Sequence, residues 1–421
     1  MLEAGTCRVY QMSRDSNEYK RVMRTLSGEN KESNLTPELI NDELTTRAIE
    51  ALSEEKEVIL IHDPSDLRKP HAEKMDNLGK VRTLEGDIIN GYSTHNIVAI
   101  TPNGKQIHLL SHKMYSNKDE HFLKAKDVKQ IEAGKEIADN TRLPLYQSDD
   151  WFNKKTLSKE AITDTNKAFK ASCPDIRVTH IFDREFDDDE YFDDINDAGD
   201  QFIIRAKKSR SRAENNESPQ RNKKEKLIES NFQSSGEKLL QQVRFKKQFY
   251  QDAKLQIDWT ADGQYTAVRV TALDREGKAI FKQPMLLITN KTVESLEEAL
   301  LIYCLYLKRS KIETVFKFLK DGLGWDSMQI QDFQAIKTLL ACCFFLAAYL
   351  YEIGKEKAYD DYAILLAELG GGNGKVTRHY ILNGIQALLS KYRIDHILKK
   401  RNPSPEMIEG MLNMAGYIGD N

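Results

Sequence analysis

Residues 176–205 read IRVTHIFDREFDDDEYFDDINDAGDQFIIR, and this stretch decides the fold class. The apolar run at 176–182 predicts a buried strand that ends at Asp183. Residues 188–198 have the spacing of an amphipathic helix, and 201–205 predict another strand. A strand, a helix and a strand in this order are typical of an α/β protein.

Further strands are expected on both sides of this unit. Residues 57–62 predict a strand that leads into turn-like residues at 63–66. Three more apolar runs predict strands, the last two joined by a hairpin turn at 102–104. These runs are 88–92, 97–101 and 106–111. Without a basic, β-rich stretch between 207 and 282, the pattern is a mixed sheet flanked by helices, compatible with a ribonuclease-H-like layout.

The bulk composition is that of a soluble globular protein. The chain has 421 residues, 40% of them hydrophobic and 30% charged, with a formal net charge of −3. The charge is unevenly distributed: 205–254 holds 14 Lys/Arg against 6 Asp/Glu, whereas 183–200 holds 10 acids and one Arg. The apolar stretch 339–351 is too short to span a bilayer and predicts a core helix. We therefore expect an intracellular protein without a membrane partner.

Four residues, Tyr306, Arg309, Glu313 and Lys320, form the pattern Y-x2-R-x3-E-x6-K. On one helix they would fall within an arc of roughly 80°, together with Lys317. The adjoining face would be apolar and buried, with Leu301, Ile312, Phe316, Leu319 and Leu323. One acid among cations suits a site that holds both a metal ion and phosphates. The alternative is an ordinary surface helix in which Arg309 and Glu313 form an i,i+4 ion pair.

Two more acids, Asp63 and Asp183, each follow an apolar strand. Strand-end acids on neighbouring strands can converge with the helical Glu313 at one edge of a sheet. Such oxygen ligands suit Mg²⁺, and two ions held there can activate a water or a 3′-hydroxyl in phosphodiester transfer. The sequence therefore predicts Asp63, Asp183 and Glu313 as metal ligands and catalytic acids.

Each strand-end acid also has a structural interpretation. Asp63 lies in good turn chemistry and could cap a turn or a helix, and Asp66 is its local competitor for the ligand role. Asp183 could pair with Arg184 or Arg205.

The other polar residues near these acids are expected to be structural. The acids at 187–190 and 193–194 are interpreted as the start and the solvated face of a helix. His62 and His180 precede the strand ends, where alternation points them to the opposite sheet face as packing residues.

At this point the chain resembles a known family, the DDE transposases of bacterial insertion sequences, and within it the YREK group (insertion sequence four-like family). Tyr306, Arg309, Glu313 and Lys320 match its signature at every spacing. Residues 183–187, Tyr191 and 202–207 are similar to the family's second-acid block, and 63–67 to its first. The resemblance extends over 57–350 and includes the family's β-rich insertion between the second and third acids.

The resemblance implies a division of the chain into five parts. They are a helical N-terminal segment (1–55), a first part of the ribonuclease-H-like catalytic core (56–206), a basic loop with a β-rich insertion (207–282), a second part of the core with the YREK helix (283–350) and a C-terminal helical region (351–421).

The resemblance further implies a DNA transposase that cleaves at the ends of an insertion sequence and joins them to target DNA. Asp63, Asp183 and Glu313 would bind two Mg²⁺ ions, for which Mn²⁺ can substitute. The expected partners are double-stranded DNA, namely terminal inverted repeats and target DNA, and a second copy of the chain in a synaptic complex. The expected location is the bacterial cytoplasm, at the nucleoid.

Basic residues around the acids would bind DNA phosphates. By resemblance these are Tyr306, Arg309 and Lys320, and we add Lys317 from the same arc of the helix. A second predicted group comprises Arg205, Lys207, Lys208 and Arg210. For this second group a solvated basic loop is the alternative.

Two departures from the family pattern keep other functions open. Only about 60 residues precede Asp63, with no clear helix-turn-helix, so either the N-terminal DNA-binding module is shortened or the ends are recognised by another part of the chain. Met285 stands where members that cleave through a DNA hairpin can place an aromatic residue. The alternatives are therefore a related endonuclease that cuts without joining, and an inactive DNA-binding remnant of a transposase.

Overall fold

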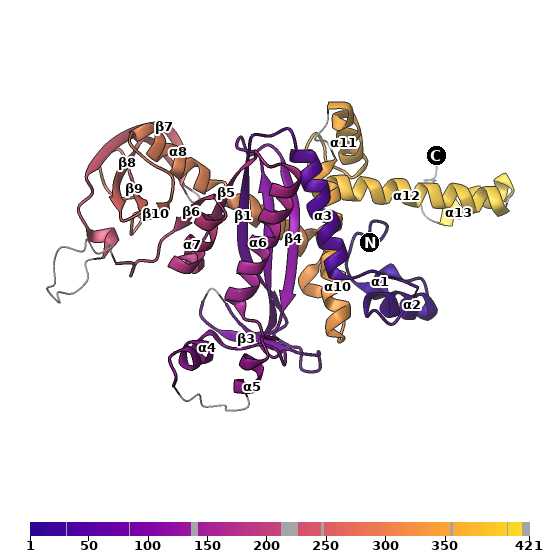
Figure 1. Ribbon diagram of the computed structural model, residues 1–421. Coiled ribbons are helices and arrows are strands. Elements are labelled where there is room, and N and C mark those ends of the chain that lie inside the picture. The colour runs from indigo at the N-terminus through magenta and orange to yellow at the C-terminus, as the bar shows by residue number, and fades with distance from the viewer. Residues whose placement is uncertain are drawn as a thin grey trace.

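A ten-stranded sheet runs through the part of the chain that the structure describes (Figure 1). The computed structural model describes residues 1–414 apart from 31, 84, 136–141, 212–225, 246–247, 354–356 and 402. The strand order is β2-β3-β1-β5-β6-β10-β9-β8-β7, and β4 pairs with β3. The strands are β1 Glu57–Arg68, β2 Gly79–Arg82, β3 Ile88–Ile100, β4 Ile107–Tyr115, β5 Arg177–Phe182, β6 Gln201–Arg205, β7 Ser234–Phe245, β8 Gln248–Asp262, β9 Tyr265–Leu273 and β10 Met285–Thr289.

The centre of the sheet is parallel and its flanks are antiparallel. Strand β5 runs parallel to both β1 and β6, whereas β3 and β10 continue the sheet on either side with antiparallel pairing. The turn predicted at 102–104 connects β3 to β4, whose first pair is Ile100 with Ile107. The predicted mixed α/β sheet flanked by helices is thus confirmed.

The helices are α1 Val9–Met12, α2 Ser16–Leu26, α3 Pro37–Leu52, α4 Ala125–Glu132, α5 Arg142–Gln147, α6 Lys154–Ser172, α7 Asp189–Asp197, α8 Leu296–Leu307, α9 Ser310–Lys317, α10 Phe333–Glu352, α11 Lys357–Leu369, α12 Arg378–Arg401 and α13 Pro405–Met414. Helix α3 begins at Pro37, because the Thr36 hydroxyl accepts from the Leu39 N–H and proline is favoured in the first turn.

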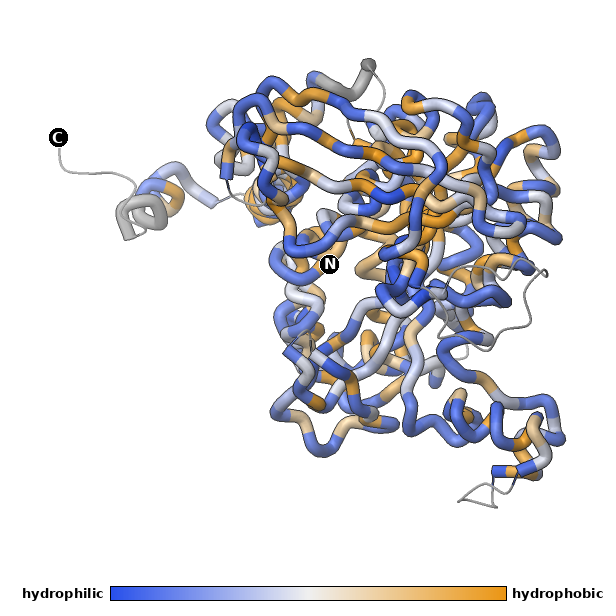
Figure 2. The backbone as a smooth tube through the Cα atoms, turned by 90° about the vertical axis from the view of Figure 1, so that its left-hand side faces the viewer, coloured by the Kyte–Doolittle hydropathy of each residue, from blue (hydrophilic) through white to orange (hydrophobic). Residues whose placement is uncertain are grey.

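Alternate residues of the central strands bury their side chains in different hydrophobic clusters. Ile59, Ile61 and Ile181 face the cluster built by α8, α9 and α10. Leu60 and Val58 face the cluster that α6 completes on the opposite side. The period of two along each strand therefore separates the sheet into an α8–α10 face and an α6 face. Figure 2 shows the hydrophobic segments gathered inside the molecule.

Strand β1 is longer than the sequence predicts. Residues 63–66 are a continuation of the strand and not a turn, since Asp63 to Arg68 pair with β3 down to Gly91. The parallel neighbour β5 stops at Phe182, opposite His62, so Pro64 meets no second strand on that side. An edge position tolerates proline, and pairing with β3 overrides the local turn preference.

The structure also differs from the expectation that one helix carries the four residues of the Y-x2-R-x3-E-x6-K motif. Helix α8 ends at Leu307, a turn follows, and α9 begins at Ser310, so the motif does not lie on one regular helix. After α9 the chain widens into a π-helical turn at Phe318–Gly322 (η3). The predicted buried face is correct for four of its residues, but Leu301 is 53% exposed.

Helix α10 is the core helix predicted from the apolar stretch at 339–351. It is long and apolar enough to cross a membrane by length and composition alone, yet 72% of its most apolar 18-residue window is buried within the structure. Core helices of soluble proteins have the same composition when other elements cover them on most sides.

The strands of the predicted insertion join the common sheet. The whole of β10 pairs with β9. Strands β8 and β7 then extend the sheet with antiparallel pairing, visible beside α8 in Figure 1. Part of the predicted basic loop, 212–225, lies outside the described residues. The five-part division of the chain stays a prediction.

Candidate active site

The two acids predicted at strand ends lie on neighbouring strands at the centre of the sheet, Asp63 within β1 and Asp183 directly after β5. The last parallel pair between β1 and β5 is His62 with Phe182, so Asp63 and Asp183 are the next residues on neighbouring strands. Alternation places both on the same face as Ile61 and Ile181, which is the α8–α10 face. The sheet register therefore brings the two predicted acids together.

Arg309 connects the third acid to this pair. It lies in the turn between α8 and α9, and its Nη1 is 2.8 Å from Asp63 Oδ1. Its Nη2 donates to Glu313 Oε1. The side chains of Arg309 and Asp63 are 18% and 15% exposed, whereas that of Glu313 is 56% exposed. The fold thus gathers an acid from the sheet and an acid from α9 around one guanidinium.

Tyr306 lies against the second acid. Its hydroxyl donates to Asp183 Oδ1 over 3.5 Å, and its ring is buried. Burial and the Asp183 charge raise the pKa of Tyr306 to about 12, against the opposing effect of Arg309 and Arg205. Tyr306 therefore remains a neutral hydrogen-bond donor, and Arg205 lies near it. The main-chain N–H of Arg184 also donates to Asp183, at 2.7 Å.

The site strongly perturbs the ionisation of Asp63. Burial raises the pKa of its carboxyl to about 7, the Arg309 charge lowers it, and the charges of Asp183, Glu313 and Glu185 raise it. Burial lowers the pKa of Arg309, but the charges of Asp63, Tyr306, Asp183 and Glu313 raise it overall. A buried carboxylate among other carboxylates favours the binding of additional positive charge.

The oxygen atoms of the three acids are of the type that binds a hard divalent cation. Asp63, Asp183 and Glu313 offer carboxylate oxygens, the ligands that Mg²⁺ prefers. Among the residues that the structure describes, however, no three His, Cys, Asp or Glu side chains lie close enough to hold one metal ion. The Arg309 guanidinium occupies the position between Asp63 and Glu313. An ion bound by all three acids would require Arg309 to move away from them.

The remaining predicted residues of the motif lie at the edge of this site. Lys317 is exposed on α9, and Lys320 is half-buried in η3. Lys320 lies close enough to Asp66 to lower its pKa, although burial raises the pKa of Asp66 overall. Asp66 thus belongs to the surroundings of the site, three residues beyond Asp63 on β1.

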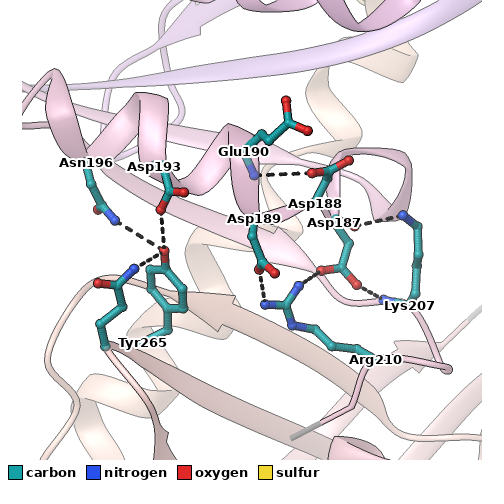
Figure 3. A network of polar contacts seen from close by, with 10 residues as sticks. Asp187, Asp188, Asp189, Glu190, Asp193, Asn196, Lys207, Arg210 and Tyr265 are labelled. Carbon is teal, nitrogen blue, oxygen red and sulfur yellow. Dashed lines mark hydrogen bonds and ion pairs between the residues drawn. The ribbon is translucent and has the colours of Figure 1, made fainter. Parts of the chain in front are cut away.

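Lys207 and Arg210 contact Asp187 and Asp189, and we call this set of structural contacts the clasp (Figure 3). Arg210 Nη1 is 2.5 Å from Asp187 Oδ1, and its Nη2 is 2.6 Å from Asp189 Oδ1. Lys207 donates to Asp187 twice, from its main-chain N–H and from Nζ. Asp187 is buried by these contacts and is not part of a solvated helix face, which corrects the sequence interpretation.

The clasp bears on whether the second group of predicted DNA-binding residues is available to contact DNA. The Arg210 guanidinium also lies 4.8 Å from the Phe192 ring centroid, so it is held on two sides. Lys208, by contrast, is exposed in the turn after β6. Contact of Arg205, Lys207, Lys208 and Arg210 with DNA stays a prediction.

The histidines beside the acids lie on the α6 face, as strand alternation predicts. His62 Nε2 is 2.9 Å from His180 Nδ1, and Ser158 Oγ of α6 is 3.1 Å from His95 Nδ1. Burial lowers the pKa of His62 and lowers that of His95 to about 3. His62 and His95 are therefore neutral packing groups beneath the site.

Sequence reasoning missed Glu185 and Lys154. Glu185 follows Asp183 in the 3-10 turn Arg184–Phe186 (η1), and it forms an ion pair with Lys154 at the start of α6. Helix α6 begins at Lys154, directly after its Asn153 cap. That cap is visible in the sequence as Asn153 followed by Thr156, whose side chains and main-chain N–H groups form a reciprocal capping box.

The comparison with protein families bears on this arrangement. Residues 158–350 match the family model of the transposase DDE domain. The match supports a DDE transposase. It covers less than half of the chain, includes Asp183 and Glu313, and begins after Asp63. No curated protein matches the chain.

Proposed function

We propose that the protein is a DNA transposase of the YREK group, which cleaves DNA at insertion-sequence ends and joins the 3′-ends to target DNA. The observation that carries the proposal is the ion pairing of Arg309 with both Asp63 and Glu313, beside Asp183 on the neighbouring strand. The match to the transposase DDE domain over 158–350 supports it independently.

We also propose a ribonuclease-H-like core. Its support is the order β4-β3-β1-β5-β6, in which an antiparallel run of three strands is followed by two strands parallel to β1. In this arrangement Asp63 within β1 and Asp183 directly after β5 face α9. These two acids and Glu313 on the covering helix would then face one substrate position.

The three acids would hold two Mg²⁺ ions. When bound, such ions polarise the scissile phosphate and stabilise the attacking and leaving oxygens. Asp63 and Asp183 would fix the position of the site relative to the rigid sheet. Glu313, which is more exposed, would complete it from α9. Arg309, released from the acids, would bind a DNA phosphate through its planar fork.

Other side chains would orient the DNA. Tyr306 keeps its proton and can donate to a phosphate oxygen at the position where it now donates to Asp183. Lys317 and Lys320 lie beyond Glu313, where they would follow the backbone without reading its sequence. The substrate would be double-stranded DNA that carries the terminal inverted repeats, held by two copies of the chain.

The test uses the inverted repeats that flank the coding region. With Mg²⁺, the wild-type protein should cut duplexes that contain these repeats and should join pre-cut ends to a supercoiled plasmid. Asp183→Asn and Glu313→Gln should abolish both steps while end binding persists. Glu297→Gln, at an exposed position of α8, is the matched control. Cleavage by either acid variant at the wild-type rate would refute the assignment, and cleavage without joined product would identify an endonuclease.

A further inference from the structure

A lysine-lined groove lies on the other side of the acids from α9. It has a volume of about 770 Å³ and runs between the start of α6, the segment 117–125 and η1. Lysines 80, 118, 124, 154 and 155 line it, against the two acids Glu185 and Asp188. Phe186 and Tyr191 form part of its apolar floor. We refer to it below as the α6 groove.

The lysines of the α6 groove differ in how they are paired. Lys154 forms an ion pair with Glu185, and Lys155 lies 3.0 Å from Asp188 and 2.6 Å from Glu190. Lys118 and Lys124 are exposed, and within the described residues neither forms an ion pair. The groove therefore presents uncompensated positive charge next to paired lysines, which suits a polyanion.

The α6 groove is close to the acids of the candidate site. Glu185, one of its lining residues, lies two residues after Asp183 in η1 and forms an ion pair with Lys154, which also lines the groove. Strand β1 thus separates two basic surfaces. Arg309 and Lys317 lie on the α8–α10 face, whereas the groove begins on the α6 face with α4 beside it (Figure 1).

Two basic surfaces on opposite faces of the sheet match a reaction with two DNA partners. Strand transfer requires the cut end and the target duplex to meet at the same acids. If α8, α9 and η3 hold the end, the second duplex has to approach from the remaining side. The lysines there offer point charges on flexible stems, which bind phosphates of any sequence.

We propose that the α6 groove binds the phosphate backbone of target DNA, with Lys118 and Lys124 in direct contact. This assignment rests on the proposed function. The main-chain N–H of Lys80 donates to Asn117 Oδ1, and Asn117 Nδ2 donates to the Lys80 carbonyl, so the segment that carries Lys118 is fixed to β2. A fixed segment positions its cations at a lower entropic cost than a free loop.

The first test measures binding and does not depend on catalysis. The full chain and its Lys118→Ala/Lys124→Ala variant are titrated with a 30-base-pair duplex of arbitrary sequence at several salt concentrations. Loss of two phosphate contacts should reduce the slope of log K against log salt by about 1.8. Between 50 and 200 mM salt, the wild-type protein should then lose about 12-fold more affinity than the variant. Lys391→Ala/Lys399→Ala on the projecting α12 is the matched control.

The second test separates target DNA from end DNA. The Lys118/Lys124 variant should cleave the ends at the wild-type rate, and joining should require a higher plasmid concentration while its maximal rate stays unchanged. An unchanged salt slope would overturn the groove as a DNA surface. Equal loss of end cleavage and of joining would overturn its assignment to the target. If the wild-type protein neither cuts nor joins, the proposed function and the target assignment both fail, whereas the salt slope still reports on the groove.

Discussion

The raised pKa of Asp63 makes the stability of the protein depend on pH. In the folded protein its pKa is about 7, against an ordinary value of 3.8, and a tenfold change in the ionisation constant corresponds to about 1.4 kcal/mol. Because the folded pKa is the higher one, the contribution is complete below pH 3.8 and is lost as the pH rises through 7. The loss between pH 5 and pH 8 is about 2.5 kcal/mol.

The variant Asp63→Asn should remove this dependence. From pH 5 to pH 8 the wild type should lose about 2.5 kcal/mol of stability that the variant does not lose. The free energy of unfolding of the variant should therefore rise by about 2.5 kcal/mol relative to that of wild type. The measurement is urea unfolding followed by circular dichroism in buffer with EDTA at both pH values. Asp197→Asn, at an exposed position of α7, controls for the substitution itself. An equal difference between Asp63→Asn and wild type at the two pH values would show that Asp63 does not carry this perturbation.

The same comparison can be repeated with Mg²⁺ at pH 8. An ion that binds the folded protein alone stabilises it by about 2.7 kcal/mol at a concentration of 100 times its Kd. Wild type should therefore gain stability with added Mg²⁺, and Asp63→Asn should gain less. An equal gain in both proteins would argue against Asp63 as a ligand.

Two further substitutions test contacts outside the site. Arg210→Ala leaves the buried Asp187 carboxylate without its ion pair and should lower the free energy of unfolding by roughly 3 kcal/mol. The control Lys208→Ala should change it by less than about 0.5 kcal/mol. Comparable urea midpoints for the two variants would contradict a stabilising role of the Arg210–Asp187 contact. The Lys69 ammonium donates to the main-chain carbonyls of Asp326 and Met328 over 2.8 and 2.7 Å. Lys69→Met removes this donor and should lower the free energy of unfolding by about 1–3 kcal/mol in the same assay. A shift within experimental error would show that these hydrogen bonds make no net contribution to stability.

Local patterns predicted the elements whose partners are close in sequence. The unit from β5 through α7 to β6 was predicted to within one or two residues. The hairpin at 102–104 was predicted from its turn residues. In each case the signal and the structure lie within a few residues of one another.

The sequence did not reveal features that depend on distant strands. Residues 63–66 have turn chemistry, yet β3 pairs with them and extends β1 to Arg68. The break between α8 and α9 is equally hidden, because Lys308 and Arg309 are ordinary helix formers. It turns Arg309 toward Asp63, a contact that one regular helix did not suggest.

For the candidate site, the sequence supplied the residues and the structure supplied their arrangement. Asp63, Asp183 and Glu313 were chosen because strand ends and a motif carry them. Their proximity depends on the parallel register of β1 and β5 and on the position of α9. Roles as metal ligands and as DNA contacts stay predictions that the experiments above address.

The pairing of β1 with β5 has a consequence for the ribosome-bound chain. Residue 57 cannot find its partner until residue 177 has left the ribosome, and Glu313 emerges later still. Contacts between distant segments form late and slowly during folding. A polypeptide released early would expose the apolar faces of β1 and β5 without the helix that completes the acids. Interrupted synthesis should therefore yield aggregation-prone fragments without the complete acid set.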